Sequence, residues 1–254
     1  MLKIFGGVQM KFRNVFFGFL KTWLLIAIFY SGSLYAAGYM FLTLDDYHPI
    51  TNDFRPYFFE RDPYTGKLTK VFDSENDFQF ETYTVGSKAD MALYKERVLP
   101  VLNDWESEVG NYEVDTDSYT SAHLTEFMKL DVTIDSGSKN ATVLTREVHV
   151  ATYKGEIEAM SYSDSSEAGV PKITTLIAKP EGLVPSQTTT VKGGGSSLLE
   201  RLVQRYKANN VEKIRLYSAK DDYYSKRGWE NEPKSDSESE SESESESEGA
   251  CGSE

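Results

Sequence analysis

The order of strand and helix patterns in residues 143–228 restricts the fold more than any other feature of this sequence. Alternating and continuous apolar runs there predict strands, and an apolar stripe at helical spacing predicts a helix. In chain order the predicted elements are two strands within 143–162 joined at Lys154-Gly155, a strand at 172–178, a helix at 196–208, a strand at 211–217 and a short helix at 221–227. This succession predicts an α/β layer, in which helices cover a central sheet.

The residues before this layer predict further elements of the same fold. Residues 78–83 alternate in the manner of a strand, and an amphipathic helix is expected from Ser87. Pro100 should kink or split that helix, because proline cannot donate the backbone hydrogen bond of a helix interior. A second helix is expected over 121–130, with Leu124, Phe127 and Met128 packing into the core.

The charges are distributed unevenly along the chain. Residues 1–36 contain four basic residues and no acidic one, and residues 235–254 contain eight acidic residues and no basic one. Subtracting both from the net charge of −13 leaves −9 for residues 37–234. A phosphate backbone is repelled by such a charge, so nucleic acid is not an expected partner.

The amino-terminal segment has the pattern of an export signal or a membrane anchor. Basic residues precede 23 uncharged residues, 22–44, and Ala36-Ala37 offers a cleavage site. An uncleaved anchor is the alternative, because such a length can cross a hydrocarbon layer of about 30 Å, and a buried helix is a third interpretation. The chain is thus expected to be secreted or extracytoplasmic, with any membrane contact confined to this segment.

Four segments follow from these patterns. Residues 1–36 form the signal peptide or anchor, 37–86 an irregular or strand-containing extension, 87–233 the α/β domain, and 234–254 a disordered acidic tail. The alternating Ser-Glu run of the tail lacks apolar residues that could offset the loss of chain entropy on folding.

A glycine triplet stands between a loop and the helix predicted at 196–208. Backbone amides of Gly193, Gly194, Gly195 and Ser196, at the positive end of a helix dipole, suit an anion such as a pyrophosphate. The residues needed for a nucleotide P-loop do not surround it. A flexible hinge is the other interpretation of the triplet.

The triplet is one part of a longer pattern that resembles the cofactor half of GNAT-type N-acetyltransferases. The matching residues are Ala178-Lys179-Pro180-Glu181 after a strand, Gly193-x-Gly195, Leu198-Leu199 in the helix, and Tyr223-Tyr224-Ser225-Lys226-Arg227-Gly228-Trp229. They lie within residues 173–229, under a quarter of the chain. The resemblance implies a mixed GNAT-like sheet flanked by helices, and transfer of an acetyl group from acetyl-CoA to an amine on a small molecule or a protein.

The resemblance also implies roles for individual residues. The amides of Gly193, Gly194, Gly195 and Ser196 would hold the cofactor's pyrophosphate. The backbone of Ile177 and Ala178 would bind its pantetheine arm. Tyr224 would protonate the departing thiolate, a role that suits a phenol with a pKa of about 10.

Other residues leave the mechanism open. Glu156, Glu158 and His149 are candidates for the general base by their chemistry alone. The three histidines share no metal-ligand spacing, and the single cysteine, Cys251, excludes a cysteine-based zinc site, so no metal is expected.

A second interpretation is a non-enzymatic binding domain that keeps this scaffold. Thr190 stands where the family has Gln or Arg, the loop before Gly193 is longer than usual, and the last strand is very short or missing. A secreted protein is also separated from coenzyme A thioesters, which are made in the cytoplasm.

Overall fold

The computed structural model describes residues 39–50, 54–137, 145–165 and 170–232. The predicted signal or anchor and the acidic Ser-Glu tail lie outside these residues, so both stay predictions. Within the described ranges, no helix combines the length and the hydropathy that a membrane span requires.

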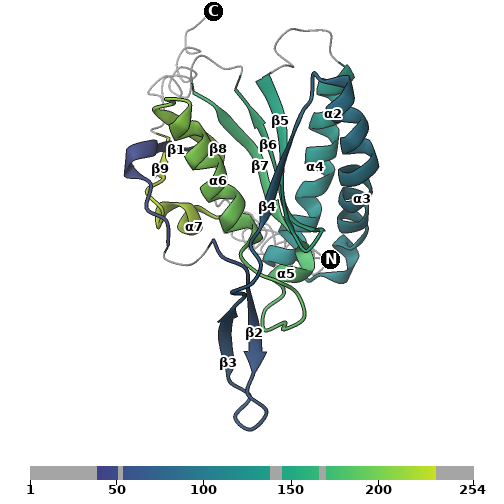
Figure 1. Cartoon of the computed structure of the whole chain (residues 1–254), viewed down its shortest axis with the longest axis vertical. Coiled ribbons are helices and arrows are strands. Elements are labelled where there is room, and N and C mark those ends of the chain that lie inside the picture. The colour runs from purple at the N-terminus through teal and green to yellow at the C-terminus, as the bar shows by residue number, and fades with distance from the viewer. Residues whose placement is uncertain (1–38, 51–53, 138–144, 166–169, 233–254) are drawn as a thin grey trace, which may run out of the picture. The chain divides into compact units, whose positions relative to one another are not determined.

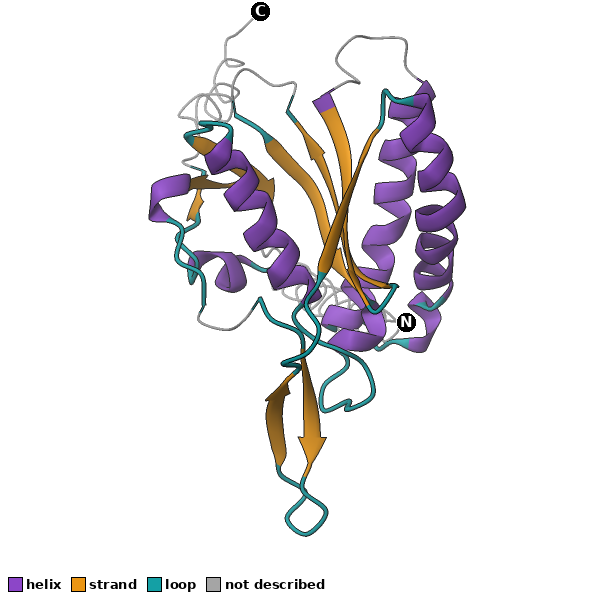
Figure 2. Ribbon diagram, in the orientation of Figure 1, coloured by secondary structure: helices purple, strands orange, loops and turns teal. Residues whose placement is uncertain are grey.

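A mixed seven-stranded sheet forms the framework of the fold (Figures 1 and 2). Its strands, in spatial order, are β4 (Gln79–Thr84), β5 (Arg146–Tyr153), β6 (Glu156–Asp164), β7 (Lys172–Ala178), β8 (Lys213–Tyr217), β1 (Tyr39–Thr43) and β9 (Glu230–Asn231). Neighbours are antiparallel except β7 and β8, which run parallel with helix α6 between them in sequence. The predicted class, a mixed sheet flanked by helices, is confirmed.

Helices pack on both faces of this sheet (Figure 2). They are α2 (Lys88–Leu93), a π-helical turn (Tyr94–Val98), α3 (Leu99–Ser107), α4 (Asp117–Gly137), α5 (Pro180–Leu183), α6 (Gly194–Ala208) and α7 (Asp221–Ser225), with short 3-10 turns at Leu44–Asp46 and Val109–Asn111. Helices α2, α3 and α4 cover one face and share a core with β5 and β6. Helix α6 covers the other face, where the residues predicted for its apolar stripe are buried.

Local sequence explains several element boundaries. The hydroxyl of Ser87 caps α2 by accepting the Asp90 amide hydrogen bond at 3.3 Å, as expected for a helix starting there. Lys154 and Gly155 both have positive φ, 51° and 87°, which is the geometry of a tight hairpin turn. Pro100 lies in the first turn of α3, directly after the π-helical turn, so the chain stays helical through it. In place of the expected kink or split, the helix has one π-helical turn before Pro100 and then continues as α3.

The second predicted helix is longer than expected, and its apolar residues divide between core and surface. Met128 is fully buried, but Phe127 is 49% exposed. The prediction that Phe127 packs into the core is therefore wrong. It joins Leu130 and Ile134 on the outer surface of α4.

The described residues of the predicted extension, 39–50 and 54–86, contribute strands to the main sheet. Strand β1 pairs with β8 over five positions, and β4 pairs with β5 over six. Between them, β2 (Tyr57–Arg61) and β3 (Leu68–Phe72) form a separate two-stranded hairpin that projects from the sheet (Figure 1). An isolated bridge between Tyr57 and Lys192 joins the base of this hairpin to the loop before α6.

Strands β7 and β8 separate after two residue pairs. Lys172 pairs with Arg215 and Ile173 with Leu216, and no described strand pairs with the rest of β7 on that side. The end of β7 thus presents backbone polar groups toward the start of α6. The candidate site lies at this end of the sheet.

Candidate functional site

The glycine triplet forms the start of helix α6, and each glycine has a different reason to be there. Gly193 is the N-cap and has a φ of 99°, in the left-handed region that favours glycine. A Cβ on Gly194 would lie 3.0 Å from the Cβ of Glu158, tighter than an ordinary contact, so glycine at this position favours the close approach of the helix to β6. A Cβ on Gly195 would make an ordinary contact of 3.5 Å with that of Ala178.

The first turn of α6 carries backbone amides without a capping side chain. Ser197 already donates to the carbonyl of Gly193 at 2.8 Å, so the amides that precede the helical ladder are those of Gly194, Gly195 and Ser196. Glu158, Ala178 and Tyr223 surround the turn. The structure therefore brings together the predicted anion-binding residues, the end of β7 and the tyrosine pair of α7.

The two residues of β7 assigned to the pantetheine arm differ in where their backbones point. The Lys179 amide donates to the Glu158 carbonyl of β6 at 2.9 Å. The backbone N–H and C=O groups of successive residues point to opposite sides of a strand, so those of Ile177, two residues earlier, also point toward β6. Leu176 and Ala178 face the side where β8 has separated. The Ala178 carbonyl accepts a hydrogen bond from the Ser121 hydroxyl. The geometry thus favours Leu176 and the Ala178 amide, in place of Ile177, as the groups open to a ligand.

Tyr224 and its neighbour Tyr223 lie on α7, over the start of α6. The Tyr223 hydroxyl is 2.8 Å from the Ser196 hydroxyl, and the Arg227 guanidinium stacks 3.7 Å from the Tyr223 ring. Tyr224 packs between Tyr223 and Trp229, with ring centroids 5.0 and 5.7 Å away. Burial raises the pKa of Tyr224 above its ordinary value, so its hydroxyl keeps its proton at neutral pH.

The loop before the triplet is closed by Gln187. Its side-chain oxygen accepts hydrogen bonds of 2.8 Å from the amides of Thr189 and Thr190, and its nitrogen donates to the Thr190 carbonyl at 3.1 Å. Thr190, which stands at the family's Gln or Arg position, is buried. The extra loop residues are therefore organised by a local amide, and they form one wall of a pocket.

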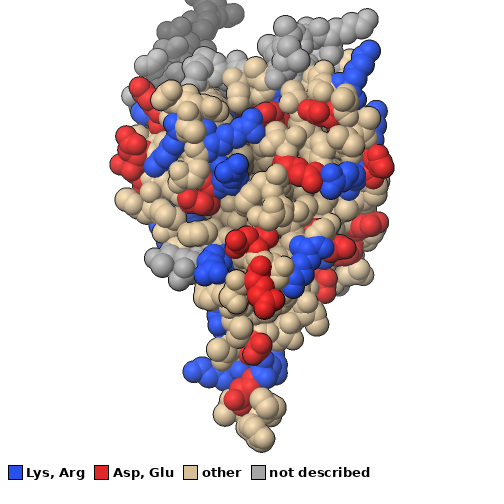
Figure 3. Space-filling view, viewed as in Figure 1, with Lys and Arg blue, Asp and Glu red and all other residues tan. Residues whose placement is uncertain are grey.

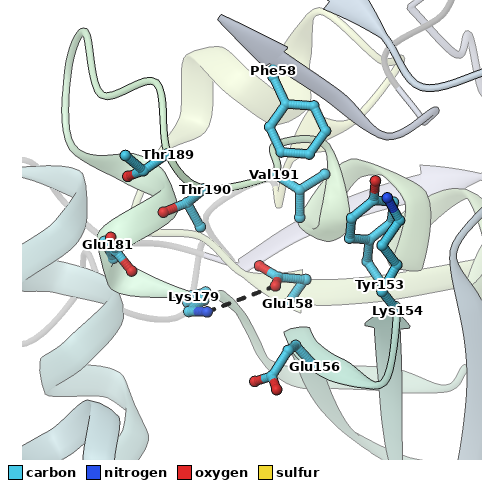
Figure 4. Close-up of a pocket in the computed structure, with 10 residues that line it drawn as sticks. All are labelled: Phe58, Tyr153, Lys154, Glu156, Glu158, Lys179, Glu181, Thr189, Thr190 and Val191. Carbon is cyan, nitrogen blue, oxygen red and sulfur yellow. Dashed lines mark ion pairs between the residues drawn. The ribbon is translucent and has the colours of Figure 1, made fainter.

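This pocket has a volume of about 290 Å³ and lies at the start of β6 and the end of β7, beside the first turn of α6 (Figure 4). Its lining comes from four separate parts of the chain: Phe58, then Tyr153, Lys154, Glu156 and Glu158, then Lys179 and Glu181, then Thr189, Thr190 and Val191. Phe58 belongs to the β2–β3 hairpin and reaches the Tyr153 ring, 6.0 Å away between centroids.

Glu158 is the most unusual carboxyl group in this pocket. It is 5% exposed, and its Oε1 lies 3.7 Å from the Lys179 ammonium, shown as a dashed line in Figure 4. Its pKa is raised to about 7, mainly by burial; Lys179 opposes this rise, and the neighbouring carboxylates of Glu156 and Glu181 add to it. A group that titrates near neutral pH can accept and release protons under ordinary conditions.

The other two candidates for the base fit less well. Glu156 lies at the exposed start of β6, on the rim of the pocket. His149 is buried between the hydroxyls of Thr82 and Ser163, 3.0 and 2.9 Å from its ring nitrogens. Burial, aided by Arg205, lowers the pKa of His149 to about 3. His149 is a neutral packing residue outside the pocket lining, so Glu158 is the candidate that the structure favours.

The raised pKa of Glu158 should make the stability of the protein depend on pH. The folded state holds the Glu158 proton more tightly than the unfolded state does. The resulting contribution to the free energy of unfolding is fully present below the ordinary glutamate pKa and is lost as the pH rises through about 7. Glu158→Gln has no carboxyl group to ionise, so this variant does not lose stability in that way. At pH 8.5 we expect the variant to be more stable by about 2–3 kcal/mol, and at pH 4 nearly equal. Urea unfolding at both pH values measures this, and a constant difference between them would contradict it.

Several of these residues carry no recognisable sequence signal. Phe58, Tyr153 and Gln187 lie outside the family pattern, and Phe58 is 100 residues away from Glu158 in the chain. Glu158 itself was one of three candidates. Among the described residues, no group of three or more His, Cys, Asp or Glu side chains could hold a metal ion.

On the face shown in Figure 3, acidic and basic side chains of the described residues are interspersed over the surface. They do not form a single basic area there.

No protein-family model and no curated protein matches the sequence. Solved structures do show similarity. An aminoglycoside acetyltransferase from an uncultured soil metagenomic sample, in complex with sisomicin, is 16% identical, with 58% of this chain and 82% of that chain covered and a TM-score of 0.33. A predicted acetyltransferase with acetyl-CoA from Clostridium acetobutylicum is 17% identical, with 62% and 92% covered and a TM-score of 0.35.

A third similar structure is the C-terminal DUF2156 domain of a putative lysylphosphatidylglycerol synthetase from Agrobacterium fabrum. It is 12% identical, with 72% of this chain and 47% of that chain covered and a TM-score of 0.39. The chain therefore spans about half the length of that structure. At such identities and TM-scores the similarities carry no argument about function.

Proposed function

We propose that this chain is an N-acyltransferase that takes an acetyl group from acetyl-CoA and places it on an amine. The observation that carries the proposal is the first turn of α6, where the amides of Gly194 and Gly195 meet the edge of β7 that β8 has left and the tyrosines of α7. The Cβ and main chain of Glu158, whose carboxyl group is suited to act as a base, lie against the same turn.

The residues present fit the cofactor in two respects. A pyrophosphate needs several N–H donors at one point, which the amides of Gly194, Gly195 and Ser196 supply at the positive end of the helix. An extended amide chain needs an open strand edge, which β7 offers after Ile173. When bound, acetyl-CoA supplies the acetyl group as a thioester.

The protein's own residues would move two protons. The Glu158 carboxylate would accept a proton from the ammonium form of the acceptor, and its pKa of about 7 suits that exchange. Tyr224 would hold a proton at its hydroxyl oxygen for the departing sulfur, because burial raises its pKa. Tyr223 would position the turn through its hydrogen bond to Ser196.

Binding of acetyl-CoA to two variants of one glycine tests the anion site. Gly195→Ala should leave the affinity nearly unchanged, because the added Cβ makes only ordinary contact with Ala178. Gly195→Asp should weaken binding at least about tenfold, because a carboxylate at the helix start repels the pyrophosphate. The same carboxylate favours the helix itself, so folding should be preserved.

Isothermal titration calorimetry on the full-length chain measures these affinities, and a thermal melt checks the fold. Equal affinities for the two variants would place the cofactor elsewhere. An absence of binding to the folded wild-type protein at millimolar acetyl-CoA would favour the second candidate function, a binding domain. The two-residue β9 and the buried Thr190 are the observations that favour this candidate.

Export through residues 1–36 is a separate proposal that the sequence pattern alone supports. Mass spectrometry of the protein recovered from outside the cytoplasm would test this proposal. Cleavage near Ala36 would give a mass smaller than that of the whole chain by the mass of the removed residues.

A further inference from the structure

We propose that the pocket beside Glu158 binds a small primary amine carrying an aromatic or other flat apolar group, and that Phe58 of the β2–β3 hairpin selects for that group. This inference rests on the proposed function in taking the bound amine to be the acyl acceptor. The binding itself is a property of the pocket and can be measured without the cofactor.

The pocket has an excess of negative charge that its own lysines do not balance. Three glutamates and two lysines line it. The Lys154 ammonium is 3.5 Å from Asp73, which lies outside the pocket lining, and it also lies 5.0 Å from the centre of the Tyr153 ring. Lys179 alone pairs with a pocket carboxylate, Glu158. A positively charged ligand therefore restores the balance.

One oxygen of Glu158 points to the kind of group that is bound. Its Oε2 is buried and has no hydrogen-bond partner among the described residues. A buried acceptor left without a donor costs about 1–3 kcal/mol, and more when it is charged. Figure 4 shows the Glu158 side chain directed into the pocket, between Val191 and Lys179. An ammonium group has three N–H donors and a positive charge, so it satisfies both requirements of this oxygen.

The opposite wall of the pocket is apolar. Phe58, Tyr153 and Val191 belong to one hydrophobic cluster, in which the rings of Phe58 and Tyr153 meet edge to face. Such a wall accommodates a flat apolar group and can also stabilise a nearby cation. Phe58 belongs to the projecting hairpin, and the bridge between Tyr57 and Lys192 holds the base of that hairpin beside the pocket. The hairpin is therefore part of the proposed recognition site.

The size of the pocket limits the ligand to a small molecule. Its volume of about 290 Å³ lies just below the range of about 300–1,000 Å³ for small-molecule sites. Thr189 and Thr190 also line the pocket. A single ring with a short aminoalkyl chain fits these dimensions and this distribution of polar groups.

Calorimetry with 2-phenylethylamine on the full-length chain, at pH 7.5 and without coenzyme A, tests the proposal. We expect measurable binding, and at least about tenfold weaker binding of 2-phenylethanol, which has the ring but no charge. Glu158→Gln should weaken the amine at least about tenfold, and Phe58→Ala about fivefold or more. Phe58→Ala should affect n-butylamine less than 2-phenylethylamine, because n-butylamine has no ring.

Two variants of β2 serve as matched controls. Phe59→Ala and Glu60→Gln change the next two residues of the strand, neither of which lines the pocket, and should leave binding within about twofold. Thermal melts show whether each variant is folded. The proposal is overturned if folded wild-type protein fails to bind 2-phenylethylamine at 10 mM, if 2-phenylethanol binds equally well, or if folded Glu158→Gln binds the amine as the wild type does.

The same experiment separates this inference from the proposed function. Amine binding without acetyl transfer would keep the pocket assignment and remove the transferase. Transfer to other amines, with no binding of 2-phenylethylamine, would keep the transferase and overturn the assignment.

Discussion

Replacement of Gly228 with alanine is expected to lower the free energy of unfolding by at least about 3 kcal/mol. Gly228 has a φ of 92°, and a Cβ there would approach the backbone carbonyl oxygen of Asp46 closer than 3.0 Å. The alanine therefore meets two penalties, a left-handed backbone and a clash with main chain that cannot rotate away. For a domain of this size we expect the midpoint of thermal unfolding to fall by about 6–12 °C.

Gly66→Ala is the matched control for this prediction. Gly66 also has a positive φ, 69°, but nothing lies within 4 Å of its added Cβ. This variant should cost only the conformational penalty of about 1–2 kcal/mol. Urea unfolding of both variants compares the two losses. Equal losses would mean that the turn after α7 does not pack on the turn after β1 as the structure shows.

Glu158→Gln is expected to reduce acetyl transfer by a factor of about 10² to 10⁴. In the wild type, kcat/KM should rise with pH and level off above about 7, because the Glu158 carboxylate must be ionised to accept the acceptor's proton. In the variant, kcat/KM should be lower at every pH and should no longer show the rise that Glu158 ionisation causes. Steady-state kinetics with acetyl-CoA and 2-phenylethylamine between pH 5.5 and 9 measure both effects.

Glu60→Gln, on the exposed part of β2, is the control and should leave the profile unchanged. A Glu158→Gln enzyme with the wild-type rate and pH profile would remove Glu158 from the mechanism. Retained acetyl-CoA affinity in the variant would show that the loss concerns proton transfer and amine binding, and not the cofactor site.

The start of helix α6 and the segment 223–229 could be located from the sequence because their signals are local. Gly193, Gly194 and Gly195 stand directly before an apolar stripe of helical period, and residues 223–229 form one continuous pattern. A helix start and the short segment after a strand are specified by neighbouring residues, so their positions were foreseen. The reason for glycine at 194 was not, because it is the approach of Glu158 from another strand.

The choice among the possible bases depended on the tertiary structure. Glu156, Glu158 and His149 are equivalent in sequence, since each lies on a strand of one hairpin. Burial then separates them: it raises the pKa of Glu158 to about 7 and lowers that of His149 to about 3. Desolvation depends on segments distant in the chain, such as the hairpin that carries Phe58, so no local pattern encodes it.

The sequence by itself determined the hairpin at Lys154-Gly155, the strand at 172–178 and the amphipathic helix α6, because periodicity and turn chemistry act over a few residues. Only the tertiary structure decided that β1 joins the sheet beside β8 and that Phe127 faces outward. The same holds for the pocket, whose walls come from four parts of the chain. Strand order and burial arise from contacts between residues far apart in sequence, and these are fixed when the whole chain packs.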